Sequence, residues 1–304
     1  MAITTALIKE LREKAGAGIL DCKAALQETN GNVEEAEKSL RKKGLAAAAK
    51  KAGRVAAEGL VGYRCDGATA ALVELNSETD FVAKTDEFGA ARQTLASVVF
   101  DAASLGDVPS GDPEAVKAMA APPALAPTGT VAEWLQFFTA KTGENTQLRR
   151  VARLVASPQG RLTLYAHPGD KTVVVVETVG CPDDLAKDVA MHVAALTPSY
   201  ASREDVPAKV LADEREIARA KAQASGKPEA VIEKMADGMV AKWFGEAVLA
   251  DQAFAKDDTK KVSQVVAERG GKDARVVRFV RFRVGEGVEK KSDDFAAEVA
   301  ALSQ

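Results

Sequence analysis

The order of strand and helix patterns constrains the fold of this chain most strongly, because one order occurs twice. Two short apolar strands joined by a tight turn precede a helical pattern in residues 60–99, and the same succession returns in residues 161–196. The predicted strands are 60–63, 70–75, 161–165 and 172–178, and the predicted helices lie around 88–99 and over 183–196. Apolar runs bounded by Asp-Gly or Pro-Gly-Asp turns are typical of β-hairpins. We therefore predict an internal structural repeat of two hairpin–helix units, although few residues are identical between them.

A further strand is predicted near the end of the chain, over residues 275–284. Its apolar face comprises Val276, Val280, Phe282 and Val284. Arg281 and Arg283 lie on the opposite face, and Arg278 interrupts the apolar one. We expect this strand to extend the second sheet.

Three short helices are predicted in the first forty-odd residues, separated by Gly16-Ala17-Gly18 and Asn30-Gly31. Asn32 is placed to cap the third helix, with Glu35 three residues later. The predicted buried positions are Leu7, Ile8, Leu11, Cys22, Ala25, Leu26, Val33, Ala36 and Leu40. Helices this short cannot enclose a large core, so we expect them to dock onto a partner or onto the rest of the chain.

A basic, alanine-rich stretch follows these helices. Residues 41–57 contain no acidic side chain and six cations, namely Arg41, Lys42, Lys43, Lys50, Lys51 and Arg54. The alanines between them favour a helix. The stretch either contacts RNA or the ribosome or is a linker helix with its lysines in water, and the second interpretation is favoured.

Two further segments separate or interrupt the predicted units. Residues 107–128 contain five of the eleven prolines, so we expect a weakly structured crossing or an insertion there. Residues 203–247 are predicted to form a helical hairpin that turns at 225–228. Its second arm carries a stripe expected to serve packing, formed by Ile232, Met235, Met239 and Trp243. An inserted hairpin of this kind is a natural protrusion for a partner to bind.

Charge and cysteine content exclude several classes of function. The 41 Lys and Arg residues nearly balance 44 Asp and Glu residues, which is not typical of a protein that coats nucleic acid. Three widely spaced cysteines do not make a disulfide framework, and with two histidines they do not make a zinc site. We expect His192 to be packed within a helix and His167 to lie exposed at a hairpin turn.

The sequence also lacks the motifs of common catalytic sites. We find no phosphate-binding loop, dinucleotide fingerprint, nucleophile elbow or zinc-protease motif. The first residues do not have the pattern of a secretory signal, and no stretch reaches the roughly 20 apolar residues of a membrane span. We therefore predict a cytoplasmic protein that is not an enzyme, with no cofactor, no metal and no membrane partner.

Residues 74–84 form a distinctive, largely polar string between a predicted strand and a predicted helix, reading Glu-Leu-Asn-Ser-Glu-Thr-Asp-Phe-Val-Ala-Lys. Loops held at such a junction often carry function. Thr79 can cap the helix, with Asp80 beside the positive end of its dipole. Phe81 either packs beneath the sheet or projects as a hydrophobic contact for a partner, and the residues alone leave both possibilities open.

This string resembles the signature of the bacterial elongation factor Ts family, the guanine-nucleotide exchange factors of elongation factor Tu. Other stretches also resemble the family, namely residues 11–26, 190–195, 225–228, 284–290 and 294–300. The similarity therefore runs nearly from end to end, and residues 107–128 are the least similar part.

The resemblance implies a role for individual residues. Segment 79–82, formed by Thr79, Asp80, Phe81 and Val82, would enter the nucleotide domain of elongation factor Tu and displace the magnesium ion that holds GDP, so that GTP can bind. Ile19, Leu20 and Lys23 would contact the same domain. His167 and Thr142 occupy further contact positions, although Pro168 separates His167 from Gly169. The family implies no cofactor, no covalent chemistry and no need for nucleic acid.

The resemblance also implies an α+β fold with antiparallel sheets and a particular domain division. The expected parts are a three-helix, UBA-like module (1–43), a basic linker (44–58), a first core subdomain (59–150), a second one (151–202 and 248–285), a coiled-coil hairpin (203–247) and a C-terminal module (286–304). The alternative function is an RNA- or ribosome-associated binding protein that uses residues 41–54. Steep salt dependence of binding to bare RNA would favour that alternative.

Overall fold

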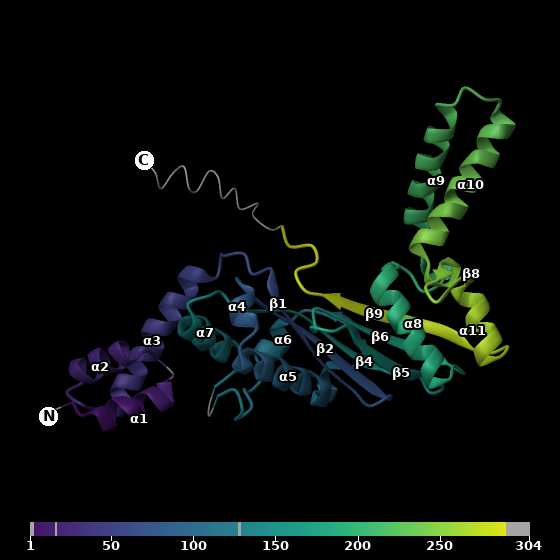
Figure 1. Cartoon of the computed structure of the whole chain (residues 1–304). Coiled ribbons are helices and arrows are strands. Elements are labelled where there is room, and N and C mark those ends of the chain that lie inside the picture. The colour runs from purple at the N-terminus through teal and green to yellow at the C-terminus, as the bar shows by residue number, and fades with distance from the viewer. Residues whose placement is uncertain (1–2, 16, 127–128, 290–304) are drawn as a thin grey trace.

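Two antiparallel sheets lie in the middle of the molecule, which a computed structural model describes over residues 3–15, 17–126 and 129–289 (Figure 1). The first sheet has the strand order β1-β2-β4-β3, and the second has the order β5-β6-β9. The strands are β1 (Glu58–Cys65), β2 (Thr69–Ser77), β3 (Val108–Gly111), β4 (Gln147–Val155), β5 (Arg161–Ala166), β6 (Thr172–Val179) and β9 (Arg275–Arg283). The predicted hairpins are confirmed, and the last predicted strand joins the second sheet beside β6.

The two sheets face each other, and helices cover their outer faces. Along β2, Leu72 points into the apolar layer between the sheets, whereas Val73 points into the layer beneath the helices. This is the alternation that a strand buried on both faces requires. The covering helices are α4 (Asp80–Ala83), α5 (Asp86–Asp101), α6 (Glu114–Lys117) and α7 (Val131–Thr142) on the first sheet, and α8 (Asp183–Leu196) and α11 (Val262–Gly270) on the second.

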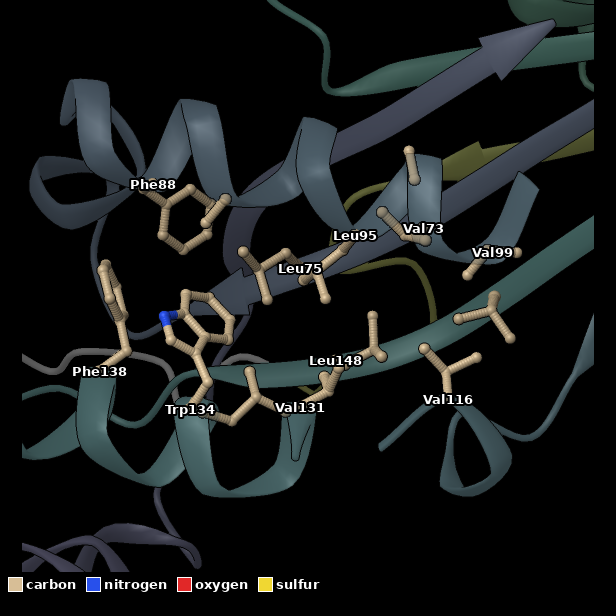
Figure 2. Packing of buried hydrophobic residues seen from close by; sticks show 14 of the residues in the cluster. Val73, Leu75, Phe88, Leu95, Val99, Val116, Val131, Trp134, Phe138 and Leu148 are labelled. Carbon is tan, nitrogen blue, oxygen red and sulfur yellow. The ribbon is translucent and has the colours of Figure 1, made fainter. Parts of the chain in front are cut away.

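Aromatic side chains fill the core beneath α5 and α7 (Figure 2). The ring of Phe138 lies 6.1 Å from that of Phe88 and 5.3 Å from that of Trp134, measured between centroids, and Phe88 and Phe138 are at most 1% exposed. Burying one such ring contributes about 2–3 kcal/mol. The first sheet and its helices therefore form a rigid base for the loops at their ends.

The predicted repeat is present in detail. Thr69, Glu74 and Asp80 in the first unit correspond to Thr172, Glu177 and Asp183 in the second, each 103 residues further along the chain. In both units the glutamate lies opposite an arginine of the next strand in the sheet, and the strand register shifts directly after the glutamate. The pairs are Glu74 with Arg150 and Glu177 with Arg278. Arg278, which interrupts the apolar pattern of its strand, is therefore placed by this ion pair.

The N-terminal helices are α1 (Thr5–Ala15), α2 (Ile19–Glu28) and α3 (Val33–Lys51). The Asn32 side chain accepts hydrogen bonds from the amides of Glu34 and Glu35, which confirms the predicted cap. Helix α3 continues through the expected boundary at residues 43 and 44, and it packs on α7, where Arg41 pairs with Glu133. Residues 41–51 of the basic stretch are therefore the second half of one long helix, and residues 52–57, which include Arg54, form the linker that follows it.

The helical hairpin projects from the second sheet at the end of the molecule opposite α1–α3 (Figure 1). Its arms are α9 (Ala208–Gln223) and α10 (Glu229–Ala247). The stripe expected to serve packing does so: Ile232 is buried, Met239 packs against the buried Ala236 and Val240, and Met235 and Trp243 are partly covered. Small residues allow close approach of two helices, so they occupy the seam. The remaining elements are η1 (Ala103–Leu105), η2 (Arg203–Asp205), η3 (Leu249–Asp251), β7 (Ala253–Phe254) and β8 (Asp257–Lys261).

The expectation of a weakly structured crossing at residues 107–128 was wrong for the described part, 107–126. Strand β3 pairs with β4, and α6 inserts the fully buried Val116 into the core of the first sheet. Prolines are compatible with an edge strand and with the first turn of a helix, where a missing amide costs no hydrogen bond. Strand β4 also spans the expected boundary at residues 150 and 151, and most of the expected C-terminal module, residues 290–304, lies outside the described residues.

Candidate functional site

Segment 79–82 lies between β2 and α5, at the junction that the sequence singles out. Its last three residues belong to the short helix α4, and Thr79 takes the capping position with an extended backbone. The Thr79 hydroxyl, however, donates a hydrogen bond to Glu144, just beyond α7, and accepts none from the helix amides, so the expectation of a side-chain cap was wrong.

The start of the segment is fixed by three hydrogen bonds. The Thr79 amide and hydroxyl both donate to the Glu144 carboxylate, at 3.0 Å and 2.6 Å. The Ser77 hydroxyl donates to the Thr79 carbonyl at 2.8 Å. Hydrogen bonds to a charged acceptor are roughly twice as strong as neutral ones, so Thr79 is held firmly.

The end of the segment is fixed by packing. Ala83 is 2% exposed, and Val82 packs against the core beneath α5 and α7. The Thr85 hydroxyl donates to the Val82 carbonyl at 2.8 Å and accepts from the Phe88 amide, which begins α5. The chain is therefore held on both sides of residues 80 and 81.

Between these two fixed points the Phe81 side chain projects outward and is 80% exposed. The alternative that it packs beneath the sheet is excluded. A single exposed phenyl ring is common on protein surfaces. Here, however, the ring is presented by a backbone that buried groups hold at both ends, which is the geometry of a preorganised contact.

A negative charge accompanies the ring. Lys84 donates to the Asp80 carboxylate at 2.6 Å. This hydrogen bond is the main cause of a lowered pKa of Asp80, with smaller contributions from the charges of Lys84 and Lys171. Asp80 is therefore ionised at neutral pH, and the site offers an anion next to an exposed apolar group.

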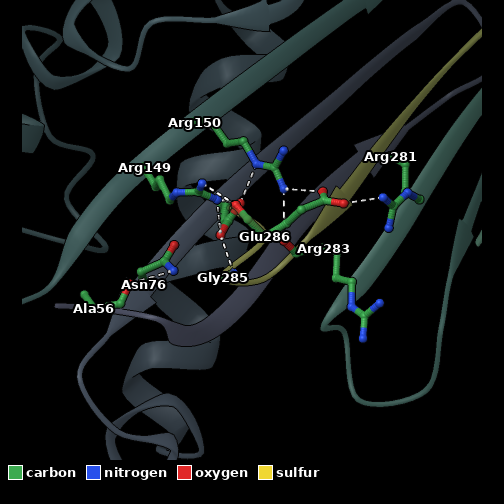
Figure 3. Close-up of polar contacts among 9 residues, drawn as sticks. Ala56, Asn76, Arg149, Arg150, Arg281, Arg283, Gly285 and Glu286 are labelled. Carbon is green, nitrogen blue, oxygen red and sulfur yellow. Dashed lines mark hydrogen bonds and ion pairs between the residues drawn. The ribbon is translucent and has the colours of Figure 1, made fainter. Parts of the chain in front are cut away.

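Polar contacts connect the segment to the linker that follows α3. The Asn145 amide donates to Glu78 at 2.6 Å, and the Asn145 side chain donates to the Arg54 carbonyl at 2.7 Å. The Asn76 side chain donates to the Ala56 carbonyl at 3.0 Å (Figure 3). Hydrogen bonds therefore join the end of β2, the loop after α7 and the linker.

A buried ionic cluster lies behind this junction (Figure 3). Glu74 on β2 is fully buried, pairs with Arg149 and Arg150, and accepts the Gly285 amide at 2.9 Å. Gly285 has φ +71°, and a Cβ there would lie 2.4 Å from the Ala57 carbonyl oxygen, so only glycine fits. The turn after β9 thereby binds the first sheet at the base of the junction.

The other predicted contact residues of the N-terminal helices are exposed. Ile19 and Leu20, at the start of α2, are 55% and 80% exposed, and Lys23 faces solvent one turn later. Ile19 and Leu20 line a surface hollow that is bordered by Lys141 of α7. The hollow therefore lies between α2 and α7, the helix that directly precedes Glu144.

Thr142 and His167 occupy different surroundings. Thr142 ends α7, and its hydroxyl donates to the Phe138 carbonyl at 2.9 Å, directly before Gly143 and Glu144. His167 is exposed in the turn between β5 and β6, where its ring accepts or donates a 3.0 Å hydrogen bond with the Tyr165 hydroxyl. The structure brings Thr142 close to segment 79–82 through Glu144.

The turn that carries His167 is docked on the first unit. Its Asp170 pairs with Arg92 of α5 and accepts from the Tyr63 hydroxyl at 3.2 Å. Lys171 in the same turn contributes to the lowered pKa of Asp80. His167 is therefore on a rigid turn.

Three of the six cations in the basic stretch have acidic partners within the chain. Arg41 pairs with Glu133, Lys43 with Glu28, and Arg54 approaches Glu78 at 3.6 Å. Paired cations contribute less to binding of phosphates, because counterion release requires free positive charge. This arrangement weakens the RNA-binding alternative.

Sequence reasoning missed the two glutamates that support the site. Glu144 lies 65 residues from Thr79, and no local pattern connects the two positions. Helix α7, which places Glu144, was recognisable: Thr130 and Glu133 form a capping box, and Gly143 ends the helix in the left-handed conformation. Glu74 was noticed only as part of the string, and its burial was not expected.

Two negative findings concern the described residues. Over 3–15, 17–126 and 129–289, the helices fall short of the length and apolarity that crossing a bilayer requires. The same residues contain no cluster of three or more histidine, cysteine, aspartate or glutamate side chains arranged to hold a metal ion.

Comparison with known proteins gives one consistent result. Residues 78–286 match the family model described as elongation factor TS. The chain is 46% identical to elongation factor Ts of Rhodospirillum rubrum over 98% of both chains, and 44% identical to that of Syntrophotalea carbinolica over the whole of both. It is 47% identical to elongation factor Ts of Sphingopyxis alaskensis over 99% of this chain and 98% of that one. The chain therefore belongs to the elongation factor Ts family, whose function is nucleotide exchange on elongation factor Tu.

Proposed function

We propose that this chain binds elongation factor Tu in its GDP-bound form, inserts segment 79–82 into the nucleotide domain, and releases GDP by displacing the magnesium ion. The observation that carries this proposal is the Phe81 ring, which is 80% exposed on a backbone held at Thr79 and Ala83. The nucleotide-free complex then accepts GTP.

The physical basis is competition for one site on the partner. Magnesium requires near-octahedral oxygen coordination and bridges the phosphates to the protein, so a small distortion weakens its binding. Burial of the Phe81 ring against the distorted partner would supply about 2 kcal/mol. Asp80, ionised and adjacent, would bind backbone amides that the ion and the phosphates leave exposed.

Exchange of this kind needs no covalent step, because the free energy of binding to elongation factor Tu drives the release of nucleotide. If the chain binds better to the partner that has lost nucleotide, then nucleotide in turn weakens the binding of the chain by the same factor. GTP binding therefore releases the factor, which acts in catalytic amounts.

Further contacts are proposed on both sides of the segment. Ile19, Leu20 and Lys23 of the N-terminal module would bind the same domain of the partner, since they are exposed on a helix next to α7. Thr142 and His167 would contribute additional contacts. The proposed division into modules has two refinements: α3 joins the first module to the linker, and β4 belongs as a whole to the first core subdomain. The exchange cycle would take place in the cytoplasm.

The test is release of labelled GDP from elongation factor Tu by catalytic amounts of the full chain. Wild type should accelerate release, and the double variant Asp80→Ala with Phe81→Ala should lower the acceleration at least roughly 30-fold, the equivalent of about 2 kcal/mol. Asp183→Ala with Asp184→Ala changes the corresponding residues of the second unit, which are about three-quarters exposed, and should leave release unchanged.

The proposal fails if wild type does not accelerate release. The assignment to segment 79–82 fails if the two double variants lose activity equally. Circular dichroism of all three proteins shows whether any loss comes from unfolding.

A further inference from the structure

We infer that Glu144 is a positioning residue for nucleotide exchange, which holds segment 79–82 in the conformation that presents Phe81. This inference rests on the proposed function for its role in exchange, but its effect on the segment is measurable in the free chain. Glu144 lies outside segment 79–82, in the loop that follows α7 and outside the first hairpin–helix unit.

The geometry singles out Glu144 among the acidic residues near the segment. Its two carboxylate oxygens take separate partners on one residue: Oε2 accepts the Thr79 amide at 3.0 Å, and Oε1 accepts the Thr79 hydroxyl at 2.6 Å. A two-point contact fixes the orientation of Thr79 as well as its position. Asp80 and Phe81 follow directly, so the rotation of this peptide determines where the ring points.

The carboxylate itself is held in place. Helix α7 ends at Gly143 in the left-handed conformation, which turns the chain toward β2. The Asn145 amide then donates to Glu78 at 2.6 Å, so Glu144 is fixed between a helix end and a reciprocal contact from the neighbouring loop. Residues 78 and 79 therefore contact residues 144 and 145 in both directions.

Loss of these contacts should slow nucleotide exchange. A flexible loop loses conformational entropy when it inserts into a partner. A loop that is already ordered in the folded chain loses less entropy at that step. Without Glu144 the segment would populate other conformations, and only part of the molecules would present Phe81 correctly. We expect the maximal exchange rate to fall about tenfold in Glu144→Ala, with a smaller change in the concentration of partner needed for half-maximal rate.

Two companion variants make the test specific. Glu144→Gln has the same shape and retains hydrogen bonds to Thr79 without the charge, so it should recover most of the rate. Glu87→Ala removes an exposed carboxylate of α5 that pairs with Lys141 of α7 at 2.7 Å, close to the site but without touching Thr79. It should exchange nucleotide like wild type.

The measurement on the free chain is residue-resolved amide hydrogen exchange by NMR. The amides of Lys84 and Thr85 donate to carbonyls within α4 and do not contact Glu144, so they report the conformation of the segment. The Thr79 amide is left out, because it loses its own acceptor in the variant. Exchange at Lys84 and Thr85 should be about tenfold faster in Glu144→Ala and unchanged in Glu87→Ala.

The outcomes separate the two proposals. Unchanged amide exchange in Glu144→Ala, or an equal effect of Glu87→Ala, overturns the positioning role. Faster amide exchange with a wild-type rate of GDP release also overturns it, because the segment then does not need to be held. A wild-type chain that fails to release GDP overturns the proposed function, whereas the amide measurement separately supports or overturns the effect of Glu144 on the segment.

Discussion

The two hairpin–helix units share a framework but differ at the junction where the second strand meets the next helix. In the first unit, the short helix α4 intervenes and presents Phe81. In the second unit the chain passes directly into α8, and Asp184 stands at the position that corresponds to Phe81. Asp184 pairs with Arg269 of α11, so its charge is satisfied within the chain.

The difference shows how one copy of a repeated framework can become functional. Both junctions follow a buried glutamate and a shift in strand register, so both are held rigidly. Only the first has an exposed apolar side chain and an acceptor, Glu144, that fixes the loop from outside the unit. The framework supplies rigidity, and a few added residues supply the contact.

The largest expected effect concerns the buried glutamates of the two units. Glu74→Ala removes a fully buried carboxylate that Arg149, Arg150 and the Gly285 amide share. The arginines then retain backbone carbonyls and a 3.5 Å contact between Arg150 and the Glu286 carboxylate, so we expect a loss of about 3 kcal/mol in the free energy of unfolding. Glu177→Ala should cost about half as much, because Arg278 retains Asp107 at 2.7 Å and the Val155 carbonyl at 2.8 Å. Urea denaturation measures both, and an equal loss would show that the two clusters are equivalent.

The next effect concerns the apolar area at residue 81. Phe81→Ala should lower the rate of GDP release roughly 30-fold, whereas Phe81→Leu should lower it only a few-fold, because leucine retains much of the buried area. Neither change should lower the melting temperature of the free chain, since the ring is 80% exposed. Release assays that give equal rates for the two variants would argue for a role of aromatic shape in place of apolar area.

A smaller effect distinguishes the cores, because the second contains a buried histidine. His192 Nδ1 accepts the Ala255 amide, and its other nitrogen lies 2.8 Å from Gln252. Burial lowers the pKa of His192, which the Gln252 contact opposes in part, so the folded state favours the neutral ring. The contribution is full above the unfolded pKa of about 6.5 and is lost as pH falls.

We therefore expect the free energy of unfolding to fall between pH 7 and pH 5.5 through His192. Denaturant titrations at both values measure this drop. His192→Gln should remove most of it, and a variant that keeps the full pH dependence would assign the effect to other groups.

The smallest effect concerns the N-terminal ends of α5 and α8, the long helices that follow the two hairpins. Thr85 caps α5 through a long hydrogen bond of 3.3 Å from the Phe88 amide, so Thr85→Ala should cost about 0.5 kcal/mol. Helix α8 begins after Pro182, whose side chain cannot accept a capping hydrogen bond. Pro182→Ala should therefore change the free energy of unfolding less than Thr85→Ala. Thermal melts of the two variants test this order, and a larger effect of Pro182→Ala would contradict the prediction.

Local patterns explain which parts of the fold were predictable. The hairpins, the N-terminal cap at Asn32 and the helices α5 and α8 follow from periodicity and turn residues close in sequence. Strand β4 was not predictable, because Arg149, Arg150 and Arg153 obscure its apolar alternation, and their acceptors lie on other elements.

The candidate site divides in the same way. The position of segment 79–82 was predicted from the sequence, since a polar string between strand and helix is visible locally. The direction of Phe81 was not, because it depends on a carboxylate 65 residues away. Contacts of that range leave no trace in the spacing of neighbouring residues.

The contact between Glu74 and Gly285 has a consequence for how the chain becomes active during synthesis. These residues are 211 positions apart, so the carboxylate receives its last donor only after nearly the whole described chain has emerged from the ribosome. This contact raises the contact order of the first unit, although its hairpin is local, and contacts between distant residues form slowly. A product that stops before residue 285 would therefore carry segment 79–82 without this donor to Glu74 at its base.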